Sequence, residues 1–417
     1  GAWSTSDPTS ATADAGTGVI TGGNVGNTMV TYTLPTGCVR TRSVTVNPLP
    51  NTIGGAGAVC EGATITLSNT TPLGTWSSAD VSVATISSTG LVNPVANTGT
   101  TTISYAVNST GCFVTKVVTV NPLPSAITGP NTMCTGLAAT MSNVDGGGVW
   151  ASGNTSIFYI NSMTGDGFAS AQGTTNITYT LPTGCRTTKS ILVNPNPGDI
   201  LGATDVCVGR QTLMTNTAPF GAWVSANTGI ATVTSSGLVR GIAAGATEIS
   251  YLLPTGCYNV TTVNVNPLPA PITGNFSICQ GATSLYLNAD TGGVWSTSSS
   301  VVASIDFGGS LTANLAGNVN LSYTLPTGCL RTQSIFINPL PTSITGVSAI
   351  CEGQTTEYNT LSTGGTWSSA APTVADIDPV TGDITTYTDG VAVMSYTLPS
   401  GCYRTRTLQV NVTPDPI

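Results

Sequence analysis

Residues 391 to 412 read Val-Ala-Val-Met-Ser-Tyr-Thr-Leu-Pro-Ser-Gly-Cys-Tyr-Arg-Thr-Arg-Thr-Leu-Gln-Val-Asn-Val, and this stretch decides the fold of the 417-residue chain. Apolar and polar residues alternate on both sides of Pro399-Ser-Gly401, as they do in strands with one buried face. Proline and glycine stand where a tight turn needs them. The stretch therefore predicts a β-hairpin formed by residues 391–398 and 403–412.

The residues before this hairpin indicate several more short strands. Glycine, proline and asparagine separate the apolar runs, and no segment has a helical apolar period of useful length. About seven short strands with such turns are typical of an antiparallel sandwich, so we expect an all-β fold. The expected strands are a split first strand at 342–346 and 348–351, followed by 355–360, 365–369, 374–377 and 384–387.

The same pattern recurs every 72 to 74 residues along the chain. Each copy has a tryptophan and a Gly-Cys pair 34 to 36 residues later, and Asn-Pro-Leu-Pro or a close variant stands between successive copies. A fixed period of this length predicts a tandem array of small similar domains, and we expect the array to be an elongated rod. The expected units are a partial repeat at 1–46 that lacks its first two strands, and complete repeats at 51–120, 125–193, 198–265, 270–337 and 342–412.

One tryptophan and one tyrosine per repeat are the expected aromatic core. A domain of about 70 residues has little interior, and large aromatic side chains supply much buried area. We expect the tyrosine before each hairpin turn to pack near the tryptophan across the sandwich. A sugar-stacking platform is the alternative for these aromatics. The tryptophans are Trp3, Trp76, Trp150, Trp223, Trp295 and Trp367.

The composition excludes several classes of function. Charged residues make up 7 % of the chain and the net charge is −8, so the clustered basic residues that bind nucleic acid are missing. The chain has no histidine and no matched carboxylate pair, so we expect no enzyme activity, no cofactor and no metal site. It has no membrane-length apolar run, and we expect no membrane insertion in this segment. Because Trp3 falls in mid-repeat, we also expect further repeats outside residues 1–417.

Two short motifs resemble known functional signals, but we interpret both as turns. Leu-Pro-Thr-Gly resembles a sortase signal but is one residue short and internal, so we interpret it as the hairpin turn. Asp145-Gly and Asp166-Gly could indicate calcium, but no Asp-x-Asp-x-Asp-Gly loop is present, and we interpret them as turns.

Several of these residues together resemble a known family. Trp76-Ser-Ser, Val83-Ala-Thr-Ile86, Gly90-Leu-Val92, a later Gly-Thr-x-x-Ile-Ser-Tyr and a closing Val-x-Val resemble the group 2 bacterial immunoglobulin-like domain over nearly the whole chain. The paired cysteines and Pro-Leu-Pro linkers depart from that pattern. They are more similar to the immunoglobulin-like and PKD-like repeats of giant surface adhesins of Bacteroidota, exported by type IX secretion. The resemblance implies tandem stalk or adhesin modules, with no shared catalytic residues.

The eleven cysteines fall into two classes, one ahead of the second strand and one after the hairpin turn, and they indicate disulfides in an oxidising, extracellular setting. Pairing within each repeat would join Cys60 to Cys112, and it would join Cys134 to Cys185, Cys207 to Cys257, Cys279 to Cys329 and Cys351 to Cys402 in the later repeats. In an immunoglobulin-like sandwich, however, the two classes lie at opposite ends of a strand about 26 Å long, at ~3.3 Å per residue, whereas a disulfide needs Cα atoms within about 7 Å. We favour bridges between neighbouring repeats and keep the first pairing as the alternative. The favoured pairs are Cys60 with Cys185, Cys134 with Cys257, Cys207 with Cys329 and Cys279 with Cys402. Cys38, Cys112 and Cys351 would then pair outside residues 1–417.

These observations favour a structural and interaction protein on the outside of a cell. Proline restricts its own φ and the residue before it, so Asn-Pro-Leu-Pro is expected to be a stiff spacer rather than a hinge. We expect a surface-attached filament or adhesin stalk about 200 to 250 Å long, at ~3.3 Å per strand residue. Its expected partners are further repeats of the same polypeptide or neighbouring chains. The alternatives are a repeat that binds a surface glycan or host ligand, and a spacer in a secreted polysaccharide-active enzyme.

Overall fold

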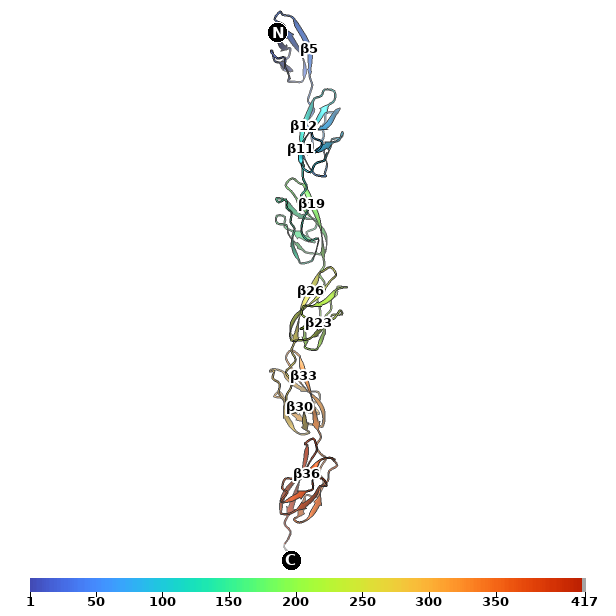
Figure 1. Ribbon diagram of the computed structural model, residues 1–417, viewed down its shortest axis with the longest axis vertical. Coiled ribbons are helices and arrows are strands. Elements are labelled where there is room, and N and C mark those ends of the chain that lie inside the picture. Colours follow the sequence, from blue (N-terminus) through green and yellow to red (C-terminus); the bar gives the residue numbers. More distant parts are fainter. Residues whose placement is uncertain (415–417) are drawn as a thin grey trace. The chain divides into compact units, whose positions relative to one another are not determined.

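The computed structural model describes residues 1–414, and these residues form β-strands and turns without a helix (Figure 1). It follows that no helix among them is long and apolar enough to cross a membrane. The chain divides into two compact units, Gly1–Asn196 with Thr255–Cys257, and Pro197–Pro254 with Tyr258–Ile417. The fold class expected from the sequence, an all-β tandem array of immunoglobulin-like sandwiches, is confirmed.

The second repeat shows the topology that all complete repeats share. One sheet has the strand order β6-β12-β11-β8, and the other has the order β7-β10-β9. β6 runs parallel to β12, whereas every other pair is antiparallel. This is the arrangement of an immunoglobulin-like sandwich whose first strand has joined the sheet of the last strand. The strands are β6 (Ala58–Cys60), β7 (Ile65–Thr66), β8 (Gly74–Ser78), β9 (Ala84–Ile86), β10 (Leu91–Pro94), β11 (Gly99–Val107) and β12 (Phe113–Asn121).

The next four repeats have the same seven strands in the same order. The third has β13 (Thr132–Cys134), β14 (Ala138–Thr140), β15 (Val149–Ser152), β16 (Phe158–Ile160), β17 (Asp166–Ala169), β18 (Gly173–Thr180) and β19 (Arg186–Asn194). The fourth has β20 (Asp205–Cys207), β21 (Gln211–Leu213), β22 (Ala222–Ser225), β23 (Ala231–Val233), β24 (Leu238–Gly241), β25 (Gly245–Leu252) and β26 (Tyr258–Asn266). The fifth has β27 (Ser277–Cys279), β28 (Thr283–Leu285), β29 (Val294–Thr297), β30 (Ala303–Ile305), β31 (Ser310–Ala313), β32 (Gly317–Thr324) and β33 (Leu330–Asn338). The sixth has β34 (Ala349–Cys351), β35 (Thr355–Glu357), β36 (Thr366–Ser369), β37 (Ala375–Ile377), β38 (Asp383–Thr386), β39 (Gly390–Thr397) and β40 (Tyr403–Asn411).

The first repeat contains only the last five strands of this pattern. Its larger sheet has the order β1-β4-β5, and its second sheet is the single pair β2-β3. Each sheet therefore lacks the strand that the complete repeats place at one edge. The strands are β1 (Ala2–Thr5), β2 (Ala11–Ala13), β3 (Ile20–Gly22), β4 (Gly26–Thr33) and β5 (Val39–Val46).

In the second to fifth repeats, the last strand continues one residue beyond the repeat boundary that we expected from the sequence. The strand includes the asparagine of the linker, as in Asn121 and Asn338, because that residue pairs with the cysteine at the end of the first strand. A proline follows immediately and has no N–H to continue the ladder. The pairing and the proline together fix where each sandwich ends.

Each complete repeat has its own hydrophobic core, and the five clusters share no residue. Tryptophan and tyrosine contact each other in all six repeats, with ring centroids 4.6 to 4.8 Å apart. They do not meet across the sandwich as expected, because the two residues are register partners on neighbouring strands of one sheet, as in Trp76 and Tyr105. The hydroxyl of Tyr105 also donates to Thr71 O at 2.6 Å and accepts from Gly74 N at 3.0 Å, which fixes the loop ahead of β8.

The burial of the tryptophans differs between repeats. Trp150 and Trp367 are buried, whereas Trp3, Trp76, Trp223 and Trp295 are half-buried. Trp76, Trp223 and Trp295 pack at the margin of their clusters. Each tryptophan thus packs against the tyrosine of its own repeat, although four of the six indole rings remain partly exposed.

Because the cores are separate, damage to one repeat should remain local. Ile249 is fully buried in the fourth repeat, and we expect Ile249→Ala to lower the unfolding free energy of that repeat by about 2–5 kcal/mol. Hydrogen exchange followed by mass spectrometry would show faster exchange in β20 to β26 only. Val260→Thr, at a position 41 % exposed on β26, is the matched control and should change stability by less than about 0.5 kcal/mol. Faster exchange throughout the chain would show that the repeats do not unfold independently.

Candidate functional site at the repeat junctions

Four disulfides join neighbouring repeats. The Cα atoms of each bonded pair are 5.5 to 5.6 Å apart, within the range of ordinary disulfides. These are the four cross-repeat pairs that the sequence favoured, and none of the pairs within a repeat is formed. The bonds are Cys60–Cys185, Cys134–Cys257, Cys207–Cys329 and Cys279–Cys402.

The register of the parallel strand pair brings one cysteine of each bond to the end of its sandwich. In every complete repeat, the cysteine that ends the first strand is the partner of the asparagine that ends the last strand, and in the second to fifth repeats this asparagine also begins the linker. The residue after the cysteine then donates its N–H to the carbonyl of that asparagine, at 2.9 to 3.0 Å. The register pairs are Cys60 with Asn121, Cys134 with Asn194, Cys207 with Asn266, Cys279 with Asn338 and Cys351 with Asn411.

The other class of cysteine lies at the opposite end of its own sandwich. Cys112 precedes β12 at the hairpin tip, whereas Cys60 lies beside Asn121 at the far end of the same strand. The eight steps from Phe113 to Asn121 span about 26 Å, at ~3.3 Å per residue. A bond between Cys60 and Cys112 would therefore need a large rearrangement, and this distance is the physical reason for the cross-repeat pairing.

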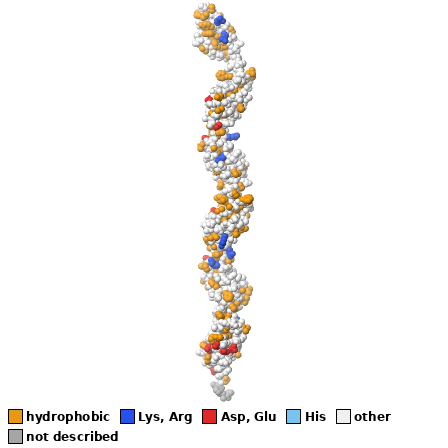
Figure 2. Space-filling view, turned by 45° about the vertical axis from the view of Figure 1, so that its right-hand side comes forward, with side chains coloured by type: hydrophobic (Ala, Val, Ile, Leu, Met, Phe, Trp, Pro, Cys, Tyr) orange, Lys and Arg blue, Asp and Glu red, His pale blue; other side chains and the backbone are white. Residues whose placement is uncertain are grey.

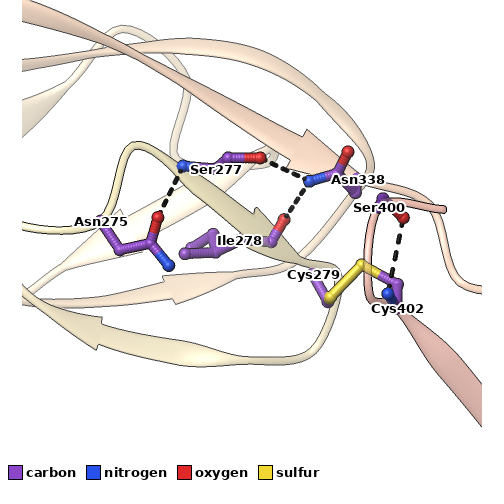
Figure 3. The surroundings of a disulfide bond; sticks show 7 residues. All are labelled: Asn275, Ser277, Ile278, Cys279, Asn338, Ser400 and Cys402. Atoms are coloured by element: carbon purple, nitrogen blue, oxygen red, sulfur yellow. Dashed lines mark hydrogen bonds between the residues drawn. A yellow bond between two sulfur atoms is a disulfide. The ribbon is translucent and has the colours of Figure 1, made fainter.

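The hairpin tip of the following repeat contacts the start of the linker directly. Cys185 Sγ lies 3.9 Å from Asn121 O, and Cys329 Sγ lies 3.8 Å from Asn266 O. These are van der Waals contacts, since a sulfur in a disulfide has no hydrogen to donate. Figure 3 shows the equivalent surroundings of Cys279–Cys402, where Asn338 Nδ2 donates to Ser277 Oγ at 2.9 Å and to Ile278 O at 3.3 Å. The asparagine thus binds the first strand through both its backbone and its side chain.

The linkers are anchored by their second proline. That proline is buried in all five linkers, while the first proline is exposed. In the fifth repeat, Arg331 Nε also donates to the carbonyl of the buried Pro269 at 2.6 Å. The linker is therefore packed at one end and joined to a paired strand at the other. The buried prolines are Pro50, Pro124, Pro197, Pro269 and Pro341.

The four bonds overlap along the sequence. Each closes a loop of 122 to 125 residues, and each loop begins before the previous one has ended. Every peptide bond between Cys60 and Cys402 therefore lies inside at least one disulfide-closed loop. Cys38 and Cys351 are unpaired and exposed, and Cys112 is unpaired and half-buried.

The remaining candidate motifs form turns and hydrogen bonds of the scaffold. Leu34 to Cys38 is a turn in which Gly37 N donates to Leu34 O at 2.9 Å, as expected for Leu-Pro-Thr-Gly. The carboxylate of Asp145 accepts from Ser125 N, and that of Asp166 accepts from Thr140 Oγ1 at 2.6 Å. The Thr140 hydroxyl lowers the pKa of Asp166.

Carboxylates elsewhere serve turns in the same way. Backbone N–H groups of Thr381 and Val380 lower the pKa of Asp378, and the N–H of Thr17 does the same for Asp14. Figure 2 shows few charged side chains on the face in view, apart from acidic residues over the sixth repeat, where Glu357 and Asp383 are cross-strand partners. Within residues 1–414, no three acidic, cysteine or histidine side chains are placed to hold a metal ion.

Two features of the junction were not predicted from the sequence. One is the pairing of each linker asparagine with a cysteine, and the other is the burial of the second proline. The signal for both was present, because asparagine precedes the first proline in all five linkers and the second proline recurs without exception. A recurrence that includes a polar residue indicates a specific contact, which a generic spacer would not need.

No family model matches the chain. It is 25 % identical over 490 aligned positions to Ice-binding protein 1 of Shewanella frigidimarina, covering 98 % of this chain and 54 % of that protein. The chain thus spans about half the length of this curated relative.

Solved structures with some likeness are multidomain proteins. Invasin, a bacterial integrin-binding protein, is 12 % identical, with 86 % of this chain and 100 % of that chain covered and a TM-score of 0.27. The N-terminal eight domains of the Down Syndrome Cell Adhesion Molecule are 12 % identical, covering 99 % and 80 %, with a TM-score of 0.23. Domains 4–9 of surface layer protein SbsC are 14 % identical, covering 99 % and 91 %, with a TM-score of 0.18. The strand order and register of each complete repeat are those of an immunoglobulin-like sandwich.

The junction geometry predicts how the chain responds to a cut. A protease site inserted after Leu123, which is exposed in its linker, would be cleaved inside the Cys60–Cys185 loop. We expect the two fragments to remain joined on a non-reducing gel and to separate after reduction. The same site inserted after Leu49, in a linker outside all four loops, is the matched control and should release its fragment without reductant. Separation after cleavage at Leu123 without reductant would show that the cysteines pair within repeats.

Proposed function

We propose that this chain is the repeat region of a secreted bacterial surface filament or adhesin stalk, stiffened by disulfides and Asn-Pro-Leu-Pro linkers. The observation that carries the proposal is the disulfide at four of the five junctions, placed directly beside the linker. A bridge in this place adds little to the core of either sandwich. Its effect is on the connection between them, which is the part of a stalk that must resist bending and pulling.

Two covalent attachments restrict motion more than one does. A domain joined to its neighbour by a single strand can bend and twist around that strand. At the bridged junctions a disulfide is added beside the linker, because the bonded cysteine and the linker asparagine are partners on adjacent strands, which lie about 4.8 Å apart. Rotation is then limited mainly to the line through the two attachments, and the buried second proline restrains that rotation further.

The surface and the redox state support an extracellular location. Eight of eleven cysteines are oxidised, which is typical of secreted proteins, and the surface has few charges (Figure 2). By the resemblance described above, we propose attachment to the surface of a member of the Bacteroidota after type IX secretion. The proposed partners are further repeats of the same polypeptide or neighbouring chains in a filament.

Electron microscopy of negatively stained particles tests the stalk. We expect thin particles about 200 to 250 Å long, at ~3.3 Å per strand residue, with a narrow distribution of bend angles. Cys207→Ser with Cys329→Ser removes one bridge, and we expect a wider bend distribution at a single position, with unchanged β-sheet content by circular dichroism. The physical reason is that only the linker would then connect those two repeats.

The matched control removes two cysteines that form no bridge in the structure. Cys112→Ser with Cys351→Ser should leave the bend distribution unchanged. Compact particles, or a wild-type chain that bends as freely as the Cys207 and Cys329 variant, would contradict the proposal.

A second candidate function is adhesion to ice, and a pair of hydroxyl side chains that recurs on one sheet of the repeats favours it. On the outward face of the larger sheet, the residue before each core tyrosine carries a hydroxyl in all six repeats, and in five its partner on the last strand does too. The relative from Shewanella frigidimarina is named an ice-binding protein. The hydroxyl pairs are Thr31 with Thr41, Ser104 with Thr115, Thr178 with Thr188, Ser322 with Thr332 and Ser395 with Thr405.

Partition into slowly growing polycrystalline ice tests this candidate. If these hydroxyl pairs bind ice, the chain should be enriched in the solid relative to an unrelated monomeric protein of similar mass. Replacing Thr31, Ser104, Thr178, Ser250, Ser322 and Ser395 together by lysine should abolish the enrichment, because each repeat would then carry a charged side chain in place of a hydroxyl. Exclusion of the wild-type chain from ice, to the same extent as the unrelated protein, removes the candidate.

A further inference from the structure

The two cysteines of each bridge differ in exposure. The hairpin cysteine has at most 1 % of its surface exposed, whereas the first-strand cysteine is half-buried. A thiolate that exchanges with a disulfide must reach one of its two sulfurs. An external thiol therefore attacks the first-strand cysteine, and the hairpin cysteine leaves. The first-strand cysteines are Cys60, Cys134, Cys207 and Cys279, and their hairpin partners are Cys185, Cys257, Cys329 and Cys402.

A pocket opens beside the Cys60–Cys185 bond. It has a volume of about 400 Å³, and its lining includes Cys60, Glu61 and Leu123 together with Arg186 of the hairpin in the third repeat. Leu123 and Arg186 are exposed, so a small molecule can enter from the solvent. Of the two bonded cysteines, Cys60 lines the pocket and Cys185 does not. A thiol that enters the pocket thus meets the sulfur that can be attacked.

The lining of this pocket carries one charge of each sign. Glu61 directly follows Cys60 and Arg186 directly follows Cys185, and both charged side chains line the pocket. A guanidinium binds a carboxylate through two parallel N–H groups, and a carboxylate binds an ammonium group through charge-assisted hydrogen bonds. The pocket is therefore complementary to a small thiol that carries a carboxylate and an ammonium group, as an amino-acid thiol does.

The other three bridges lack these two charges. Their Cα separations are the same, 5.5 to 5.6 Å, and in each the hairpin cysteine is the buried one. The charge pair is thus a feature of one junction and not of the repeat pattern, and the other bridges are references within the same chain. The residues directly after their bonded cysteines are Thr135 and Tyr258, Val208 and Leu330, and Gln280 and Tyr403.

We propose that the Cys60–Cys185 bridge is a thiol-exchange site for a small amino-acid thiol, whose carboxylate binds Arg186 and whose ammonium group binds Glu61. The thiolate of the ligand attacks Cys60 Sγ and forms a new disulfide, the Cys60–Cys185 bond breaks, and Cys185 Sγ leaves as a thiolate that takes a proton from water. One disulfide replaces another, so the step needs no separate oxidant or reductant.

The exchange changes the connection between the second and third repeats. Cys60 then carries the ligand as a mixed disulfide, and the linker is the covalent connection that remains at this junction. The other three bridges keep their bonds, so the modification acts at one position of the chain. The exchange itself does not depend on the proposed stalk function, since it is a reaction of the sulfurs and can be measured on them directly.

The rates of exchange at the four bridges of the full chain test the proposal. Iodoacetamide first blocks the free thiols, L-cysteine is then added, and peptide mapping by mass spectrometry identifies the residues that become cysteinylated. We expect Cys60 to react at least about tenfold faster than Cys134, Cys207 or Cys279, because binding raises the effective concentration of the thiol. A second alkylating reagent, added after an acid quench, should label Cys185 as the sulfur that leaves.

The choice of thiol separates recognition by charge from access. The ratio of the rate at Cys60 to the mean rate at the other three bridges cancels the intrinsic reactivity of each thiol. We expect this ratio to be highest for cysteine, lower for cysteamine and mercaptoacetate, which each carry one of the two charged groups, and lowest for uncharged 2-mercaptoethanol. An equal ratio for cysteine and 2-mercaptoethanol would mean that access alone decides, and would overturn the proposal.

Residues taken from the other junctions provide matched variants. Arg186→Tyr and Glu61→Gln each introduce a residue that another bridge has at the same position, and each should lower the ratio for cysteine without changing the ratio for 2-mercaptoethanol. The reverse change, Thr135→Glu with Tyr258→Arg, should raise the rate at Cys134 selectively. Circular dichroism checks the β-sheet content, and a misfolded variant would change the rates at all four bridges. An unchanged ratio for cysteine in Arg186→Tyr would contradict the assignment of the site.

Discussion

The structure depends on one register, in which the cysteine of the first strand is the partner of the asparagine that ends the last strand. This parallel pairing brings the sulfur to the end of the sandwich, beside the backbone that leaves for the next repeat. A shift of one residue would turn the cysteine side chain to the other face of the sheet. The bond to the next hairpin tip could then not form, and the junction would be left with the linker alone.

The position of the bridges changes what they contribute. Small extracellular domains commonly use disulfides to compensate for a small core. Here each sandwich instead relies on its own cluster, in which a tryptophan and a tyrosine contact each other on neighbouring strands. The bridges close loops of more than 120 residues that pass through two repeats. Their overlap means that a single cut between Cys60 and Cys402 breaks no connection from end to end, which suits an extracellular protein exposed to proteases.

Much of this arrangement could be predicted from the sequence, and the limits have physical causes. Alternation around Pro399-Ser-Gly401 and the period of the tryptophans were sufficient for the strands and the repeat, because both depend on local chemistry. The cross-repeat bridges followed from the length of one strand and the reach of a disulfide. Two contacts could not be derived in this way. Trp367 and Tyr396 contact each other within one sheet because the strand order makes β36 and β39 neighbours. β40 extends to Asn411 because Cys351 on β34 is the register partner of that residue.

The first two strands of each complete repeat also explain how the eight bonded cysteines can find the right partners. The cysteine is positioned at the end of the sandwich only after this segment has paired with the last strand and its apolar residues have entered the core, as Val59 and Leu67 do in the second repeat. Its distance from the hairpin tip of the same repeat then forbids the local bond. Folding of one repeat therefore precedes its correct bridge to the next, and the pairing is selected by docking rather than by proximity in sequence.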